Sequence, residues 1–411
     1  MRWHPKGLWN NSDFVKLWVG KTISNFGNGI TGIALPLTAV LVLSATPVQM
    51  GILGALSSVA VLVVGLLAGV WVDRLRRRPI LITSDLGRAL LLASIPLAAL
   101  LGVLQLAQVY VVAALVGILS IFFDVADAAY LPSLVPQEQL VEANSKLGIS
   151  DSLAEIGGPA SAGPLIQLFG APLAIFFDAL SFLLSALSVG LIRTPEAQPS
   201  SVEQRQSAWR ESSEGLRLIR NNALLRSLAI SAMLFNFFGN FIGTLYVLYI
   251  VREVHAAPLV IGFLVAAGGI SALVGAIIAQ RVIQRIGPGL AIGGMLTLYG
   301  LTGLLVPLAH DPVNVAVALL FTSQLIGDAS VAIYLIAEIS LRQAIIPNAF
   351  LGRVNASMQF LTQGVGPVAA ILAGILGTII GLRLTIFTGV LGVIFAGAWL
   401  LFSPVRRVRS I

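Results

Sequence analysis

The sequence is poor in charged residues and contains no cysteine. Only 10% of its 411 residues are Asp, Glu, Lys or Arg, against about 25% in soluble globular domains, so an ordinary soluble protein is excluded. Without cysteine, the chain has no disulfide framework, no cysteine-based metal site and no thiol nucleophile. The three histidines, His4, His255 and His310, lie outside the apolar segments, and no two are spaced as metal ligands. We therefore expect no cofactor, no metal site and no enzyme activity.

Long hydrophobic runs take the place of the charges. Hydrophobic residues make up 57% of the chain, and residues 22–72 and 89–123 include no Asp, Glu, Lys or Arg. A transmembrane helix needs about 20 apolar residues, so each run is long enough for one or two helices. Continuous hydropathy also argues against a membrane barrel, whose strands alternate polar and apolar residues. The sequence predicts an all-α integral membrane protein.

Twelve apolar segments are separated by proline, glycine or charged residues. They lie near residues 14–43, 48–72, 80–102, 108–131, 141–168, 172–192, 224–250, 258–283, 290–309, 313–341, 352–380 and 384–402. The polar stretch 193–222 divides them into two sets of six. We therefore expect an N-terminal six-helix bundle over 1–192, a cytoplasmic linker over 193–222 and a C-terminal six-helix bundle over 223–411. An amphipathic piece around Trp209, Leu216 and Ile219 should lie on the membrane surface.

The two halves match each other at a constant offset of 211 residues. The matched pairs are Asn25 with Asn236, Pro47 with Pro258, Gly51 with Gly262, Pro136 with Pro347 and Asn144 with Asn355. Such a register indicates an internal duplication. Because each half has an even number of spans, both halves run in the same direction and are related by a pseudo-two-fold axis.

The basic residues are distributed unevenly over the loops. If both termini are cytoplasmic, the outer loops hold only Arg252 and Arg383, and the remaining loop Lys and Arg residues lie inside. This bias is typical of cytoplasmic loops and predicts that orientation. The net charge of +7 is thus explained by topology. We expect membrane lipid as a partner and no nucleic acid.

Several carboxylates fall within the predicted spans, where a charge costs roughly 2.5–3.5 kcal/mol. Asp124 and Asp127 are three residues apart in the fourth span, and Asp151 and Glu155 are four apart in the fifth, so each pair shares a helix face. Asp328 lies in the tenth span. Such acids either pair with basic residues or exchange protons. We expect Asp151, Glu155, Asp328 and Asp124 to be the candidates for proton coupling.

Amide side chains recur at helical spacing in three spans. They are Asn25 and Asn28 in the first span, Asn236 and Asn240 in the seventh and Gln359 in the eleventh. Each set could be polar contact between helices. Their equivalent placement in the two halves favours a shared polar cavity, so we expect these five residues to contact a small-molecule substrate.

The loop between the second and third spans resembles motif A of the major facilitator superfamily. The matching residues are Gly69, Asp73, Arg74, Arg77 and Arg78, with Arg76 at the family's second glycine. The resemblance implies the major facilitator fold of twelve transmembrane helices in two bundles. It also implies that these residues form a conformational latch with an acid on a neighbouring helix, for which Asp127 is our candidate.

The fifth span resembles the antiporter motif C of the same superfamily. The matching residues are Gly158, Pro159, Gly163 and Pro164, with Ala162 at one glycine position. Segments 84–89, 122–128 and 131–136 are similar to the enterobactin-exporter and macrolide-efflux branch. The arginine of that family's motif B is missing. The resemblance implies a bacterial inner-membrane exporter of an amphipathic small molecule, driven by protons. A facilitator or importer of a small metabolite is the alternative.

Overall fold

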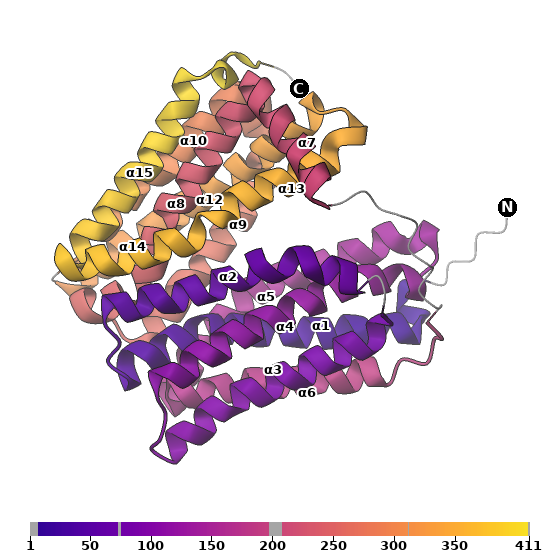
Figure 1. Ribbon diagram of the computed structural model, residues 1–411. Helices are drawn as coiled ribbons and strands as arrows, with labels where there is room; N and C mark the ends of the chain where they lie inside the picture. Colours follow the sequence, from indigo (N-terminus) through magenta and orange to yellow (C-terminus); the bar gives the residue numbers. More distant parts are fainter. Residues whose placement is uncertain (1–6, 73–74, 197–207, 311, 410–411) are drawn as a thin grey trace. The chain divides into compact units, whose positions relative to one another are not determined.

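The computed structural model describes residues 7–72, 75–196, 208–310 and 312–409. Within 60–70, 208–214 and 348–349 it describes the backbone alone. Every regular element in the described ranges is helical, as Figure 1 shows. This confirms the predicted all-α class.

Ten helical stretches are long and apolar enough to cross a membrane. They are Ser12–Val42, Arg77–Leu100, Leu106–Leu134, Ala171–Gly190, Ala223–Val254, Pro258–Ile286, Pro288–Leu308, Val313–Ile345, Phe350–Ile379 and Leu382–Phe402. The protein is therefore an integral membrane protein. The second and fifth predicted spans also form helices, α2 (Pro47–Val72) and α5 (Leu140–Phe169).

The chain divides into two compact units, each with its own core. The first holds residues 1–43 and 59–204, and the second holds 44–58 and 205–411. Residues 44–58, which include the start of α2, thus group with the second unit. A close backbone contact joins them to that unit, since a Cβ atom on Gly51 would lie 2.6 Å from the carbonyl oxygen of Ala370.

The first unit is built around α1 (Ser12–Leu37) and α6 (Ala171–Gly190). Helix α1 packs on α6 and α5, α6 also packs on α3 (Arg77–Leu100), and α3 packs on α4 (Leu106–Leu134). Small residues permit the central contact, since a Cβ atom on Gly27 would lie 2.2 Å from Asp178 Oδ1. One end of the unit is closed by a buried cluster that includes Phe14, Leu17, Leu81, Tyr130 and Val189.

Polar side chains fix the ends of these helices. Asn11 caps α1 by accepting hydrogen bonds from the amides of Asp13 and Phe14, and its own amide donates to the Leu134 carbonyl at the end of α4. The Asp13 carboxylate accepts from both the amide and the hydroxyl of Thr194, beyond the end of α6. The caps therefore also tie α1 to α4 and α6.

The second unit has a comparable helix arrangement. Helix α8 (Ala223–Tyr249) packs on α15 (Leu382–Phe402) and α14 (Gly366–Ile379). Helix α12 (Val313–Ile345) packs on α9 (Pro258–Ile286) and α10 (Pro288–Gly303), and a short helix α11 (Leu305–Leu308) follows α10. Helix α7 (Ala208–Asn221), in the predicted amphipathic segment, packs on α13 (Asn348–Gly364) and buries Ile219.

The internal repeat of the sequence also appears in the backbone conformation of two glycines. Gly170 precedes α6 with φ 85° and ψ 157°, and Gly381 precedes α15 with φ 86° and ψ 161°. Their numbers differ by 211, which is the offset of the sequence repeat. Residues with a side chain rarely adopt this conformation, so both halves use a glycine for the same turn.

Replacement of Gly170 or Gly381 by alanine should destabilise the protein by about 1–3 kcal/mol, because the turn requires a positive φ. The measurement is thermal unfolding of the purified protein in detergent. Gly239→Ala is the matched control, since Gly239 is helical and a Cβ atom there would meet nothing within 4 Å. Equal melting temperatures for all three variants would contradict the prediction.

Candidate functional site

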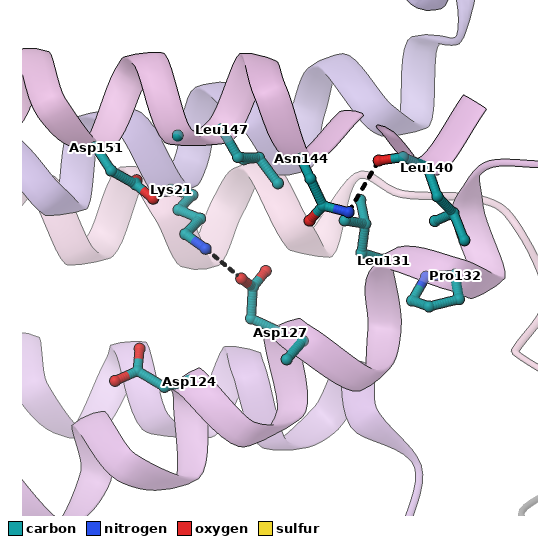
Figure 2. Close-up of a pocket in the computed structure, with 11 residues that line it drawn as sticks. Lys21, Asp124, Asp127, Leu131, Pro132, Leu140, Asn144, Leu147 and Asp151 are labelled. Carbon is teal, nitrogen blue, oxygen red and sulfur yellow. Dashed lines mark hydrogen bonds and ion pairs between the residues drawn. The ribbon is translucent and has the colours of Figure 1, made fainter. Parts of the chain in front are cut away.

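The first unit contains a polar cavity between α1, α4 and α5. Its volume is about 420 Å³, within the range of small-molecule sites. Figure 2 shows its wall, to which the three helices contribute side chains. The lining residues are Lys21, Asp124, Asp127, Ala128, Leu131, Pro132, Leu140, Asn144, Leu147, Gly148 and Asp151.

An ion pair between α1 and α4 crosses this cavity. Lys21 Nζ lies 2.5 Å from Asp127 Oδ2, and Figure 2 shows the bond spanning the space between the helices. Asp127 is buried, with 4% of its surface exposed. Its second oxygen, Oδ1, has no hydrogen-bond partner among the described residues. The pair thus satisfies only half of the hydrogen-bonding capacity of this carboxylate.

Two further carboxylates face the same space. Asp151 Oδ1 accepts a hydrogen bond of 2.7 Å from Asn25 Nδ2. Asp124, one turn before Asp127, is exposed to the cavity and makes no hydrogen bond to any described residue. Of the predicted coupling residues, Asp124 and Asp151 are therefore brought together here, while Glu155 is exposed and is not part of the wall.

Close packing between α1 and α5 holds the two polar faces in register. A Cβ atom on Gly29 would lie 2.8 Å from the Cα atom of Gly158, and one on Gly157 would lie 2.3 Å from the Phe26 ring. Pro159 and Gly163 are buried beside this contact. Further along, Trp18 Nε1 donates to Ser150 Oγ at 2.8 Å. The motif C residues thus set the helix spacing at which Asn25 reaches Asp151.

A second charged cluster, not predicted from the sequence, is buried in the first unit. Arg88 is 2% exposed and donates a hydrogen bond of 2.5 Å to Asp85 and one of 3.3 Å to Ser120. Its guanidinium lies 4.4 Å from the ring centre of Phe123 and 4.1 Å from that of Phe182. The sequence could have predicted this ion pair, because Asp85 and Arg88 are one turn apart within an apolar span.

The motif A residues are described in part. Asp73 and Arg74 lie outside the described residues, and at Gly69 only the backbone is described. The backbone amides of Arg77 and Arg78 donate to Glu196, and the Arg78 guanidinium donates to the carbonyls of Val189 and Gly190 at the end of α6. Among the described residues, the cation that pairs with Asp127 is Lys21.

The predicted residues of the second unit do not form a comparable wall. The amides of Asn236 and Asn240 donate to carbonyls one turn earlier on their own helix, α8. Gln359 on α13 is exposed, as is Asn28 on α1 in the first unit. Asp328 on α12 is half-buried, and a Cβ atom on Gly268 of α9 would lie 2.2 Å from its Oδ2.

Asp328 lies near a small cavity of about 40 Å³ whose wall includes Tyr246, Tyr299, Ser323 and Gln324. Within the described ranges of the whole chain, no group of three or more acidic or histidine side chains is placed to hold a metal ion. The polar cavity of the first unit is therefore the better candidate for a functional site.

Replacement of Arg88 alone by methionine should lower stability by about 3–5 kcal/mol, because it leaves the buried Asp85 carboxylate without its counter-ion. The double variant Arg88→Met/Asp85→Leu should regain most of this loss, since neither charge is then buried. Thermal unfolding in detergent measures both. A double variant as unstable as the single one would show that the pair is not the source of the effect.

Comparisons with known proteins place the chain among transporters. The model of the Major Facilitator Superfamily matches residues 17–249, which is more than half of the chain. The multidrug efflux pump Tap of Mycolicibacterium fortuitum is 28% identical over 94% of this chain and 93% of its own length. Macrolide efflux protein A of Streptococcus pyogenes is 27% identical over 54% of this chain and 55% of its own.

The solved structures agree on the fold. A mutant of the nucleoside transporter NupG superposes with a TM-score of 0.80 at 12% sequence identity, covering 95% of this chain and 99% of that one. The predicted resemblance is confirmed, and with it the expectation that the protein is not an enzyme. The chain belongs to the Major Facilitator Superfamily of transporters.

Proposed function

We propose that the protein is a secondary active exporter, which expels an amphipathic small molecule such as a drug, a macrolide or a siderophore in exchange for protons. The observation that carries this proposal is the cavity in which Asp124, Asp127 and Asp151 face a single ammonium, that of Lys21. Two relatives with efflux in their names, Tap and macrolide efflux protein A, support the direction of transport.

The proposal includes the organisation of the whole chain. Twelve transmembrane helices form two bundles, 1–192 and 223–411, which are related by a pseudo-two-fold axis and joined by a cytoplasmic linker over 193–222. Both termini are cytoplasmic, and the membrane is the inner membrane of a bacterial cell. The bundles rock about a central cavity in alternating access, and Asn25, Asn28, Asn236, Asn240 and Gln359 contact the substrate there.

Proton coupling follows from the cost of carrying a charge through the membrane interior. A carboxylate that has bound a proton is neutral, so the conformation that buries it becomes less costly. Asp151 and Glu155 are the first candidates for this exchange because they share one face of α5, and Asp328 and Asp124 are the next. The return of the empty carrier with a proton then links proton entry to substrate exit.

The motif residues have mechanical roles in this proposal. Gly69, Asp73, Arg74, Arg77 and Arg78 form the latch that holds the outward-facing state, together with Asp127. Gly158, Pro159, Gly163 and Pro164 keep α5 close to α1.

The double variant Asp151→Asn/Glu155→Gln should abolish transport driven by a pH gradient, since neither side chain can then exchange a proton. The measurement uses purified protein in liposomes with an internal pH dye, an imposed gradient, and siderophore, macrolide and cationic-dye candidates added in turn. Glu142→Gln is the matched control on the same helix, because Glu142 is exposed and pairs with Lys146 away from the cavity. Full activity of the double variant would contradict the assignment of Asp151 and Glu155 as proton carriers. Substrate flux without proton movement would indicate a facilitator.

A further inference from the structure

The charges on the wall of the first-unit cavity do not balance. Among the described residues, three carboxylates, those of Asp124, Asp127 and Asp151, line it, against the single ammonium of Lys21. When all four groups are ionised, the wall carries a net charge of −2. Carboxylates that share one site repel one another, so the cavity favours an additional cation over a neutral or anionic guest.

Asp127 presents a specific acceptor to such a guest. Its side chain is 6% exposed, and its Oδ2 is occupied by Lys21. The other oxygen, Oδ1, is buried without a hydrogen-bond partner among the described residues, although Asp127 is part of the cavity wall. Figure 2 shows the carboxylate directed into the space between α4 and α5. A buried carboxylate oxygen gains most from a charged donor.

Lys21 has the chemistry of an exchangeable partner. Its ammonium is a compact charge on a flexible four-carbon stem, unlike the rigid fork of an arginine. The side chain is 21% exposed, so it has room to move. Asp151 faces it from α5 and Asp124 from α4, so Lys21 can leave Asp127 and still remain near a carboxylate.

The remainder of the wall suits an apolar body. Leu131, Pro132, Leu140 and Leu147 line the cavity beside the carboxylates. The volume of about 420 Å³ accommodates a molecule larger than an inorganic ion. The wall therefore combines one charged acceptor with an apolar surface a few side chains away.

We infer that this cavity binds amphipathic organic cations, and that the Lys21 ammonium is a built-in occupant which the protonated amine of the substrate displaces from Asp127. The inference rests on the proposed function in taking the guest to be a transported substrate. It adds the chemical class of that substrate and a role for Lys21. The amine takes the place of the Lys21 ammonium on Asp127, and Lys21 moves to Asp151 or Asp124. No covalent bond changes.

The test uses dansylcadaverine, a fluorescent probe whose five-carbon chain ends in a protonated primary amine, and its N-acetyl derivative, which has the same body without the charge. Binding to the purified full-length protein in detergent is followed by dansyl fluorescence. The unsubstituted protein should prefer the charged probe. Lys21→Met removes the competing ammonium and should tighten binding of dansylcadaverine about tenfold, or about 1.4 kcal/mol, while binding of the N-acetyl probe stays within about twofold.

Lys16→Met is the matched control, because Lys16 is on the same helix but pairs with Asp13 outside this cavity. It should leave both affinities unchanged. Asp127→Asn should remove most of the preference for the charged probe. Lys21→Arg retains the charge and can hold both Asp127 oxygens, so it should weaken binding of dansylcadaverine. Lys21→Arg therefore tests the inference even if the Lys21→Met variant does not fold.

Unchanged affinity for dansylcadaverine in both Lys21 variants would overturn the inference, as would an equal gain for the N-acetyl probe. The proposed function is judged separately, by gradient-driven flux of both probes in liposomes. If both probes bind with equal affinity and both are exported, the inference of a cation site is wrong, but the proposed proton-driven export is still supported. If the variants show the expected binding pattern but neither probe is transported along a gradient, the cation site is supported and the proposed export function is refuted.

Discussion

A carboxylate in the interior of a membrane protein must have a counter-ion, hydrogen-bond donors or a proton, because its charge is expensive away from water. The ion pair between Lys21 and Asp127 meets this requirement across α1 and α4. The ion pair meets this requirement incompletely, since one oxygen of Asp127 has no partner among the described residues and two more carboxylates share the cavity. An arrangement with this remaining deficit is suited to bind a cation or exchange a proton, whereas a fully paired network would be inert.

The two halves of the chain use the duplicated helices differently. Arg88 of the first unit corresponds at the 211-residue offset to Tyr299 of the second. Arg88 pairs with Asp85, while Tyr299 packs edge-on against Phe235, which also contacts Tyr334. Lys21 corresponds to Ala232. The position of Arg88 thus holds an aromatic ring in the second half and that of Lys21 an alanine, whereas that of Asp127 keeps a buried carboxylate, Glu338.

Much of the fold could be predicted because hydropathy and helical periodicity act locally. The twelve apolar segments coincide with helices, and the glycine turn at Gly170 recurs at Gly381 in the register of the repeat. Hydropathy identifies a span without identifying the helices that pack on it. The grouping of residues 44–58 with the second unit depends on tertiary contacts such as that of Gly51 with Ala370 of α14.

The sequence by itself determined that the chain lies in a membrane and where its helices run. It also determined that Asp124 and Asp127 share one face of one helix, and Asp151 and Glu155 one face of another. The tertiary structure decided that Lys21 is the partner of Asp127, that Asn25 is the partner of Asp151, and that Glu155 lies outside the cavity. The physical reason is that these pairs join different helices. The register of Asn25 and Asp151 depends on the close approach of α1 and α5 at Gly29 and Gly158, which no spacing within one helix encodes.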